Sequence, residues 1–179
     1  MPLTKQPFTY ELALLGLLRR APRHGYELYQ ELTRPEGLWA IWRMKQSQMY
    51  ALLARLEREG YLTSTLKVQE TRPARKMFRL TRAGQAAFWH WLQSPIHNPR
   101  EMRLDFLLKF YFARREGLET ARQLITAQRA VCEARLEDET SKVEHARQAQ
   151  TDLWLIEQFR VEQLRALLNW LDQCEQSLA

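Results

Sequence analysis

Hydrophobic residues recur at helical spacing in three successive segments of the N-terminal half of the chain. The pattern predicts helices over residues 9–19 and 23–33, and a third helix that begins at Ser47 and ends before Gly60. In this third segment, an apolar stripe with i, i+3, i+4, i+7 spacing lies opposite a polar and basic stripe. The apolar stripe comprises Met49, Leu52, Leu53 and Leu56, and the polar stripe comprises Gln48, Ala51, Arg55 and Arg58.

The hydrophobic period changes from helical to alternating after Gly60. Residues 61–69 alternate between apolar and polar side chains, which is typical of a half-buried strand. A turn over residues 70–75 and a second short strand over residues 76–80 complete a predicted hairpin. Its tip carries three basic residues, Arg72, Arg75 and Lys76, and a fourth helix is expected over residues 82–93.

The C-terminal half has a helical pattern throughout. Residues 95–99 contain two prolines and resemble a linker, so we predict two domains, 1–94 and 95–179. Helices are expected over residues 101–112, 118–147 and 150–178, and the last two carry narrow apolar stripes, partly with seven-residue spacing. This spacing predicts that the two helices pack on each other and on a second copy of the chain. The predicted dimer-interface residues are Leu118, Ile125, Cys132, Leu136, Trp154, Val161, Leu164, Leu168 and Leu171.

Only the first half of the molecule has a net positive charge. Residues 1–92 carry 15 Lys and Arg against 7 Asp and Glu, whereas residues 93–179 carry 12 against 14. A basic first half favours a polyanionic partner, although an ordinary solvated surface accounts for the charge equally well when it is taken alone.

Several classes of protein lack support in the sequence. There is no run of about 18 apolar residues and no signal-peptide pattern at the N-terminus, so we expect a cytoplasmic protein without membrane contact. Cys132 and Cys174 are far apart and outside any metal-binding motif. The four histidines have no spacing with a nucleophile or with one another that suggests catalysis. We therefore predict no enzyme activity, no metal and no cofactor.

Three helices followed by a basic hairpin is the order of elements in a winged helix-turn-helix domain. The predicted fold is thus mostly α with a small β-hairpin wing, a winged helix-turn-helix domain followed by a helical dimerisation domain. The third helix can enter the major groove of double-stranded DNA, and the wing can meet phosphates or a minor groove. Tyr50 either donates to a phosphate or packs inside, and both interpretations remain open. The predicted DNA-binding residues are Ser47, Gln48, Tyr50, Ala51, Arg55, Arg58, Arg72, Arg75 and Lys76.

Four blocks of this sequence resemble the PadR family of bacterial regulators. They are Glu11–Leu18, Pro22–Leu28, Ser47–Gly60 and Arg72–Gly84, in the family's order. The segment Arg103–Phe110 resembles the C-terminal domain of virulence-activator-type members. The resemblance implies a homodimeric transcriptional regulator, more in keeping with a repressor than an activator, that binds a pseudo-palindromic operator.

Two further hypotheses remain open on the sequence. A winged helix can serve protein–protein assembly without binding DNA, although such modules usually lose the basic wing that this chain keeps. A small, flat, mostly apolar aromatic effector is also conceivable, with Trp39 and Trp42 as candidate lining residues. The alternative is that all six tryptophans are structural.

Overall fold

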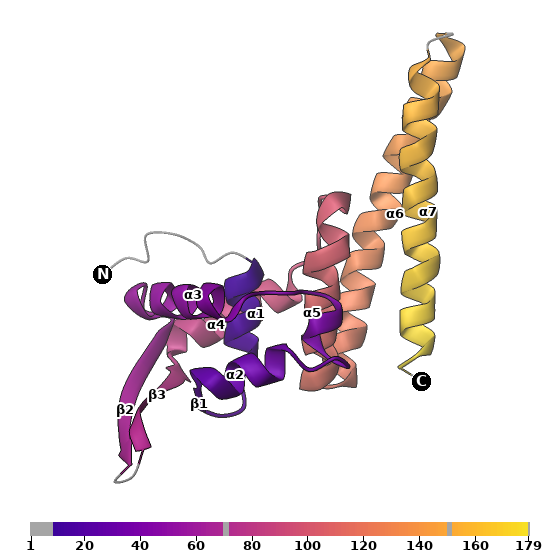
Figure 1. Cartoon of the computed structure of the whole chain (residues 1–179). Coiled ribbons are helices and arrows are strands. Elements are labelled where there is room, and N and C mark those ends of the chain that lie inside the picture. Colours follow the sequence, from indigo (N-terminus) through magenta and orange to yellow (C-terminus); the bar gives the residue numbers. More distant parts are fainter. Residues whose placement is uncertain (1–8, 70–71, 150–151, 179) are drawn as a thin grey trace. The chain divides into compact units, whose positions relative to one another are not determined.

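The computed structural model describes residues 9–69, 72–149 and 152–178, and leaves the side chains of residues 67–75 undescribed. The chain is mostly helical, with one small antiparallel sheet (Figure 1). It forms two compact units. The first extends to Leu92 and also includes Leu107–Phe112, and the second comprises Gln93–Phe106 and the chain from Ala113 onward.

Four helices form the core of the first unit. They are α1 (Thr9–Leu17), α2 (Gly25–Leu32), α3 (Gln46–Arg58) and α4 (Arg82–Gln93). Their apolar faces meet around fully buried side chains that include Leu14, Leu28, Leu53 and Phe88. Thr81 caps the α4 helix, because its hydroxyl accepts a hydrogen bond from the Gly84 amide at 3.0 Å.

A three-stranded sheet completes the winged helix-turn-helix fold, which confirms the predicted fold class. Strands β2 (Leu62–Gln69) and β3 (Arg72–Leu80) form the wing, so β3 begins earlier than the predicted 76–80. A third strand, β1 (Arg23–His24), pairs with β3 and gives the order β1-β3-β2. The sequence placed Arg23 and His24 in a helix. That assignment was wrong because α2 begins only at Gly25, where Glu27 accepts a hydrogen bond from the His24 amide at 2.9 Å.

The segment after the predicted linker is an irregular helix. A 3-10 turn (Pro99–Glu101) and a π-helical turn (Met102–Phe106) lead into α5 (Leu107–Glu116). Within the first unit, the Phe112 ring stands edge-on to Phe88 and Trp91, with ring centroids 5.7 and 6.2 Å apart. Edge-to-face aromatic pairs of this kind stabilise beyond the area they bury.

The second unit is dominated by a hairpin of two long helices, α6 (Leu118–Gln148) and α7 (Leu153–Gln176), which lie side by side (Figure 1). Ion pairs cross between them: Arg129 on α6 binds Asp172 and Glu175 on α7, the latter at 2.8 Å. None of the described helices is long and apolar enough to cross a membrane.

A buried glutamine fixes part of the predicted linker to the second unit. The Gln128 side-chain oxygen accepts a hydrogen bond from the Ile96 amide at 2.6 Å, and its NH₂ group donates to the Ile96 carbonyl at 2.9 Å. Both backbone groups of Ile96 are therefore satisfied by one side chain on α6.

Candidate nucleic-acid interface

The outward face of α3 is a row of small and polar side chains. Ser47, Ala51, Ala54 and Arg58 follow one another at helical spacing and are all exposed. Gln48 and Tyr50 are exposed on either side of this row. We call these six residues the reading face. Ala54 was missed in the sequence analysis, although its spacing from Ser47 and Arg58 was available there.

The start of α3 is held by contacts of two of its predicted DNA-binding residues. Gln48 accepts a hydrogen bond from the Lys45 amide at 3.0 Å, so the helix begins one residue earlier than predicted, at Gln46. The Tyr50 ring lies against Gly25 at the start of α2, and a Cβ on residue 25 would collide with that ring. Tyr50 nevertheless remains 40% exposed, so one side of its ring packs while the rest faces outward.

Arg55 lies in a different environment from the rest of its predicted stripe. Its side chain is only 20% exposed, and its guanidinium binds the fully buried Glu11 on α1 at 3.2 Å and Glu59 at 2.8 Å. The hydrogen bond to Glu59, aided by the charge of Glu11, raises the pKa of Arg55 above its ordinary value. This cluster joins α3 to α1. Arg58, three residues further along, is exposed.

The end of α3 is connected to the wing through Glu57. This carboxylate accepts hydrogen bonds from the Ser64 hydroxyl on β2 and from the Lys76 ammonium on β3, both at 2.5 Å. The Lys76 bond, followed by the Ser64 bond, lowers the pKa of Glu57 below its ordinary value. We call Glu57, Ser64 and Lys76 the wing latch. The side chains of Arg72 and Arg75, predicted at the wing tip, lie outside the described residues.

The two tryptophans predicted as candidate effector contacts both engage other side chains of the first unit. Trp42 is buried and stacks on Tyr10, with ring centroids 4.9 Å apart. Trp39 is half-buried, and the Arg43 guanidinium lies 5.7 Å from the centre of its ring. Trp42 thus contributes to packing around α1.

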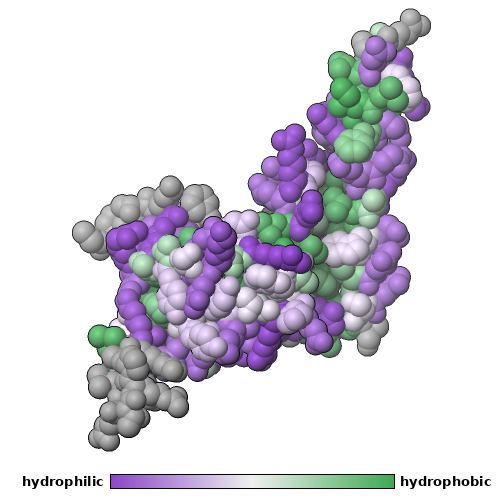
Figure 2. All heavy atoms as spheres, viewed as in Figure 1, coloured by the Kyte–Doolittle hydropathy of each residue, from purple (hydrophilic) through white to green (hydrophobic). Residues whose placement is uncertain are grey.

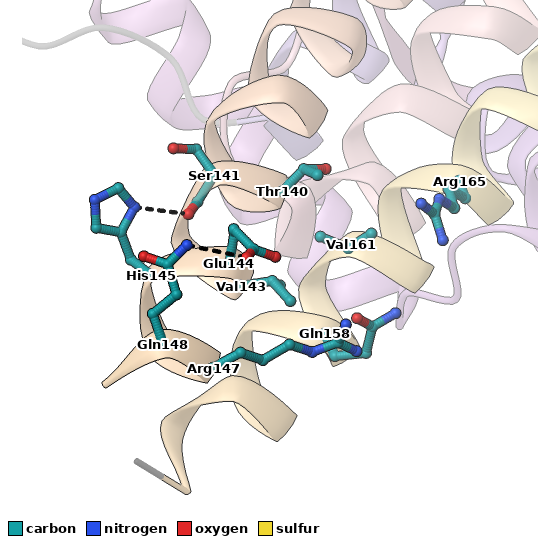
Figure 3. Close-up of a pocket in the computed structure, with 10 residues that line it drawn as sticks. All are labelled: Thr140, Ser141, Val143, Glu144, His145, Arg147, Gln148, Gln158, Val161 and Arg165. Atoms are coloured by element: carbon teal, nitrogen blue, oxygen red, sulfur yellow. Dashed lines mark hydrogen bonds between the residues drawn. The ribbon is translucent and has the colours of Figure 1, made fainter. Parts of the chain in front are cut away.

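A hollow of about 610 Å³ lies between α6 and α7 in the second unit (Figure 3). Val143 and Val161 are buried there, and the arginines Arg147 and Arg165 come from opposite helices. The Arg147 guanidinium also lies 5.1 Å from the centre of the Trp154 ring. The hollow therefore combines an apolar base with cationic and amide groups. Its lining residues are Thr140, Ser141, Val143, Glu144, His145, Arg147, Gln148, Gln158, Val161 and Arg165.

The predicted dimer-interface residues are distributed over several environments. Five of them are buried within the single chain, namely Ile125, Cys132, Val161, Leu164 and Leu171. Leu136, Trp154 and Leu168 are half-buried, and Leu118 is exposed. Much of the predicted stripe is thus covered within a single chain.

A second apolar surface, which the sequence analysis did not identify, lies at the start of α7. Its four large side chains are 50–63% exposed. Figure 2 shows hydrophobic side chains gathered near the same end of the α6–α7 hairpin. We call this surface the apical patch; it comprises Leu153, Leu155, Ile156 and Phe159.

The described residues offer little chemistry beyond these surfaces. No group of three or more His, Cys, Asp or Glu side chains among them could hold a metal ion. Cys132 and Cys174 are buried thiols, and burial raises the pKa of each. A raised pKa disfavours the reactive thiolate.

The chain is similar to known transcriptional regulators. The model of the transcriptional regulator PadR-like family matches residues 14–89. The negative transcriptional regulator PadR of Bacillus subtilis (strain 168) is 32% identical over 126 residues, which are 70% of this chain and 68% of that protein. A crystal structure of Bacillus subtilis PadR in complex with operator DNA has 26% identity and a TM-score of 0.49, covering 96% of this chain and 100% of that one. A structure of Bacillus subtilis PadR in complex with p-coumaric acid has 25% identity and a TM-score of 0.42, covering 95% of each chain.

Proposed function

Since this chain belongs to the PadR-like family of transcriptional regulators, we propose that it is a repressor that binds a pseudo-palindromic DNA operator as a homodimer. Membership of the family confirms the predictions of a regulator and of a protein that is not an enzyme. The relative from Bacillus subtilis is a negative regulator, which supports repression by this chain as well.

The observation that carries the proposal is the reading face of α3. Ala51 and Ala54 allow the helix to approach the floor of a major groove closely, and Ser47 and Gln48 supply groups that can bond to base edges. In this proposal, Arg58 and the Tyr50 hydroxyl contact phosphates, together with the wing residues Arg72, Arg75 and Lys76. Arg55 is left out of this DNA interface because its guanidinium is engaged by Glu11 and Glu59.

A binding titration tests the proposed DNA contact. The full-length chain is titrated against a duplex from its own upstream region and against a scrambled duplex, between 50 and 200 mM salt. A dimer that neutralises six or more phosphates should lose about 10³-fold in affinity over that range. Arg58→Ala should weaken binding, whereas Arg122→Ala, an exposed arginine on α6, should not. Salt-independent binding with no preference for either duplex would favour the protein-assembly alternative.

The homodimer is proposed to form through the second unit, which holds most of the predicted domain 95–179 of the virulence-activator type. Four exposed large apolar side chains at one helix end form the kind of surface that marks a protein interface. We therefore assign the centre of the dimer contact to the apical patch, with Leu118 and the half-buried members of the predicted stripe around it.

The dimer assignment is tested by sedimentation of two charge variants. Phe159→Glu would bury a charge in the proposed contact and should shift the protein to monomers. Gln173→Glu adds the same charge at an exposed position of α7 and should leave the dimer intact. If both variants remain dimeric, the contact lies elsewhere; if the unmodified protein is a monomer, the homodimer itself is refuted.

A small aromatic acid is proposed as the effector, bound in the hollow between α6 and α7. Arg147 and Arg165 can pair with a carboxylate, while Val143 and Val161 can pack against a ring. We choose p-coumaric acid as the probe because it is the compound in the structure of the Bacillus subtilis relative. Saturable quenching of tryptophan fluorescence, lost in Arg165→Ala and accompanied by release of the duplex, is expected. Quenching without release would argue against an effector role.

A further inference from the structure

The wing latch connects Lys76, a cation of the proposed DNA interface, to Glu57, a carboxylate on α3. The Lys76 ammonium donates to Glu57 at 2.5 Å and also lies over the Phe78 ring, 5.4 Å from its centre. Lys76 is 46% exposed and Glu57 is 28% exposed, so both groups can still be reached from solvent. The pair has no net charge, and a neutral pair attracts a distant phosphate far less than a lone ammonium would.

The other contact of Glu57 keeps it in place beside the lysine. Ser64 on β2 donates to the second carboxylate oxygen at 2.5 Å, so the carboxylate bridges both strands of the wing. Ser64 lies beside Phe78 in the register of β2 and β3, two residues from Lys76. The carboxylate is thus held at the point where α3 meets the wing, where its charge competes with a phosphate for Lys76.

We infer that Glu57 is a specificity-determining residue, which withholds Lys76 from DNA phosphates unless the duplex fits the reading face. This inference rests on the proposed DNA binding. A helix that does not fit the groove leaves the wing further from the backbone, so Lys76 stays paired with Glu57. On a matching operator, a backbone phosphate comes close enough to replace Glu57 as the partner of Lys76. The carboxylate thereby lowers affinity for wrong sequences more than for the right one, which raises the ratio between them.

The experiment compares full-length protein with the variants Glu57→Gln, Lys76→Met and the double variant. Glutamine keeps an acceptor for Ser64 but loses the charge, and methionine keeps an unbranched side chain but loses the ammonium. Binding to an operator duplex and to a random duplex is measured by fluorescence anisotropy between 50 and 200 mM salt.

Glu57→Gln is expected to bind random duplex more tightly than the unmodified protein. Its slope of log affinity against log salt should steepen by about 0.9 for each protomer, as one further phosphate contact requires. Between 50 and 200 mM salt, the loss of affinity for random duplex is then about threefold larger for each protomer than in the unmodified protein. Its affinity for the operator should rise less, so the ratio of the two affinities falls. A residue that merely supports the fold would change neither the slope nor this ratio in that direction.

Lys76→Met, which substitutes no residue of α3, provides a second measurement. It should lower operator affinity and flatten the operator slope by about 0.9 per protomer, with little change on random duplex. In the double variant the gain on random duplex should disappear.

Three results would overturn the inference: weaker binding of Glu57→Gln to both duplexes, an equal loss of Lys76→Met on both, or a gain that persists in the double variant. In each of these cases the operator is still bound, and the proposed function stands. A different result would refute the proposed DNA binding itself. In that case, neither the unmodified protein nor any variant shows salt-dependent binding to DNA.

Discussion

Arg55 and Arg58 are three residues apart on α3, yet they have different partners. Arg55 is held by the fully buried Glu11, and Arg58 is exposed. Arg55→Ala removes the cation from beside a buried carboxylate, which is costly. We expect it to lower the midpoint of urea denaturation clearly, while Arg58→Ala leaves the midpoint nearly unchanged and weakens operator binding. Circular dichroism in urea measures the first effect, and the opposite order would refute the assignment of Arg55 to the fold.

The wing latch predicts a dependence of stability on pH. The pKa of Glu57 in the folded protein lies below its ordinary value of 4.5, because Lys76 and Ser64 donate to the charged form. The stability that this carboxylate contributes is therefore present above that ordinary value, and is lost as the pH falls through the lowered folded-state pKa. Unmodified protein should be more stable than Glu57→Gln at pH 7, and the gap should narrow towards pH 3. Urea denaturation at both pH values measures it, and a constant gap would show that the charge has no part in it.

At the scale of elements, the sequence pattern predicted the helices and the wing but did not indicate the partners of Arg55 on α3. Apolar periodicity identifies which positions face inward, and Met49, Leu53 and Leu56 are indeed buried. Apolar periodicity does not indicate which polar residue pairs with a residue that is distant in the sequence. Arg55 pairs with a residue more than forty positions away in the chain, and no local signal records that contact. Ala54 is absent from the predicted polar stripe for the same reason, because that stripe includes its neighbour Arg55.

Ala54 gives a direct test of the reading face. A larger side chain there would hold α3 away from the groove floor without disturbing the core, because the position is exposed. Ala54→Leu should lower operator affinity by at least about tenfold, equivalent to about 1.4 kcal/mol, with an unchanged melting temperature. Ala166→Leu, at an exposed position on α7, is the matched control and should bind as the unmodified chain does. Equal affinities for both variants would place the DNA contact on another surface.

The α6–α7 hairpin shows a second limit of prediction from sequence. Heptad-like spacing is produced equally by a helix that packs on its own chain and by one that packs on a copy. The structure buries Val161, Leu164 and Leu171 within the chain, and the exposed apolar residues form a separate group at the start of α7. Strand β1 has only two residues and is too short for any periodicity to reveal.

For the whole molecule, the main departure from the sequence pattern is that the first unit is discontinuous. It takes in Leu107–Phe112, which lies beyond the linker-like residues 95–99. A linker composition indicates where the chain can leave a unit. It does not indicate that a later helix returns to it, since that depends on aromatic packing between Phe112, Phe88 and Trp91.

The discontinuity predicts how truncated chains behave. Residues 1–116 should melt at a higher temperature than residues 1–94, because only the longer piece supplies Phe112. In the full-length chain, Phe112→Ala should cost about 3–5 kcal/mol of unfolding free energy, as is usual for a buried phenylalanine. Tyr26→Ala, at a position on α2 that is 55% exposed, is the control and should cost much less. Thermal and urea denaturation followed by circular dichroism measure both, and equal stability of the two fragments would contradict the role of Phe112.

The discontinuous unit also has a consequence for synthesis on the ribosome. Phe112 is added 20 residues after Leu92, and translation at about 5–20 residues per second takes about 1–4 s over that distance. During that interval the nascent winged part lacks the ring that packs edge-on to Phe88 and Trp91. Each newly made chain therefore passes through a short period in which its aromatic core is incomplete. We expect chaperones that bind apolar segments to recognise it in that period.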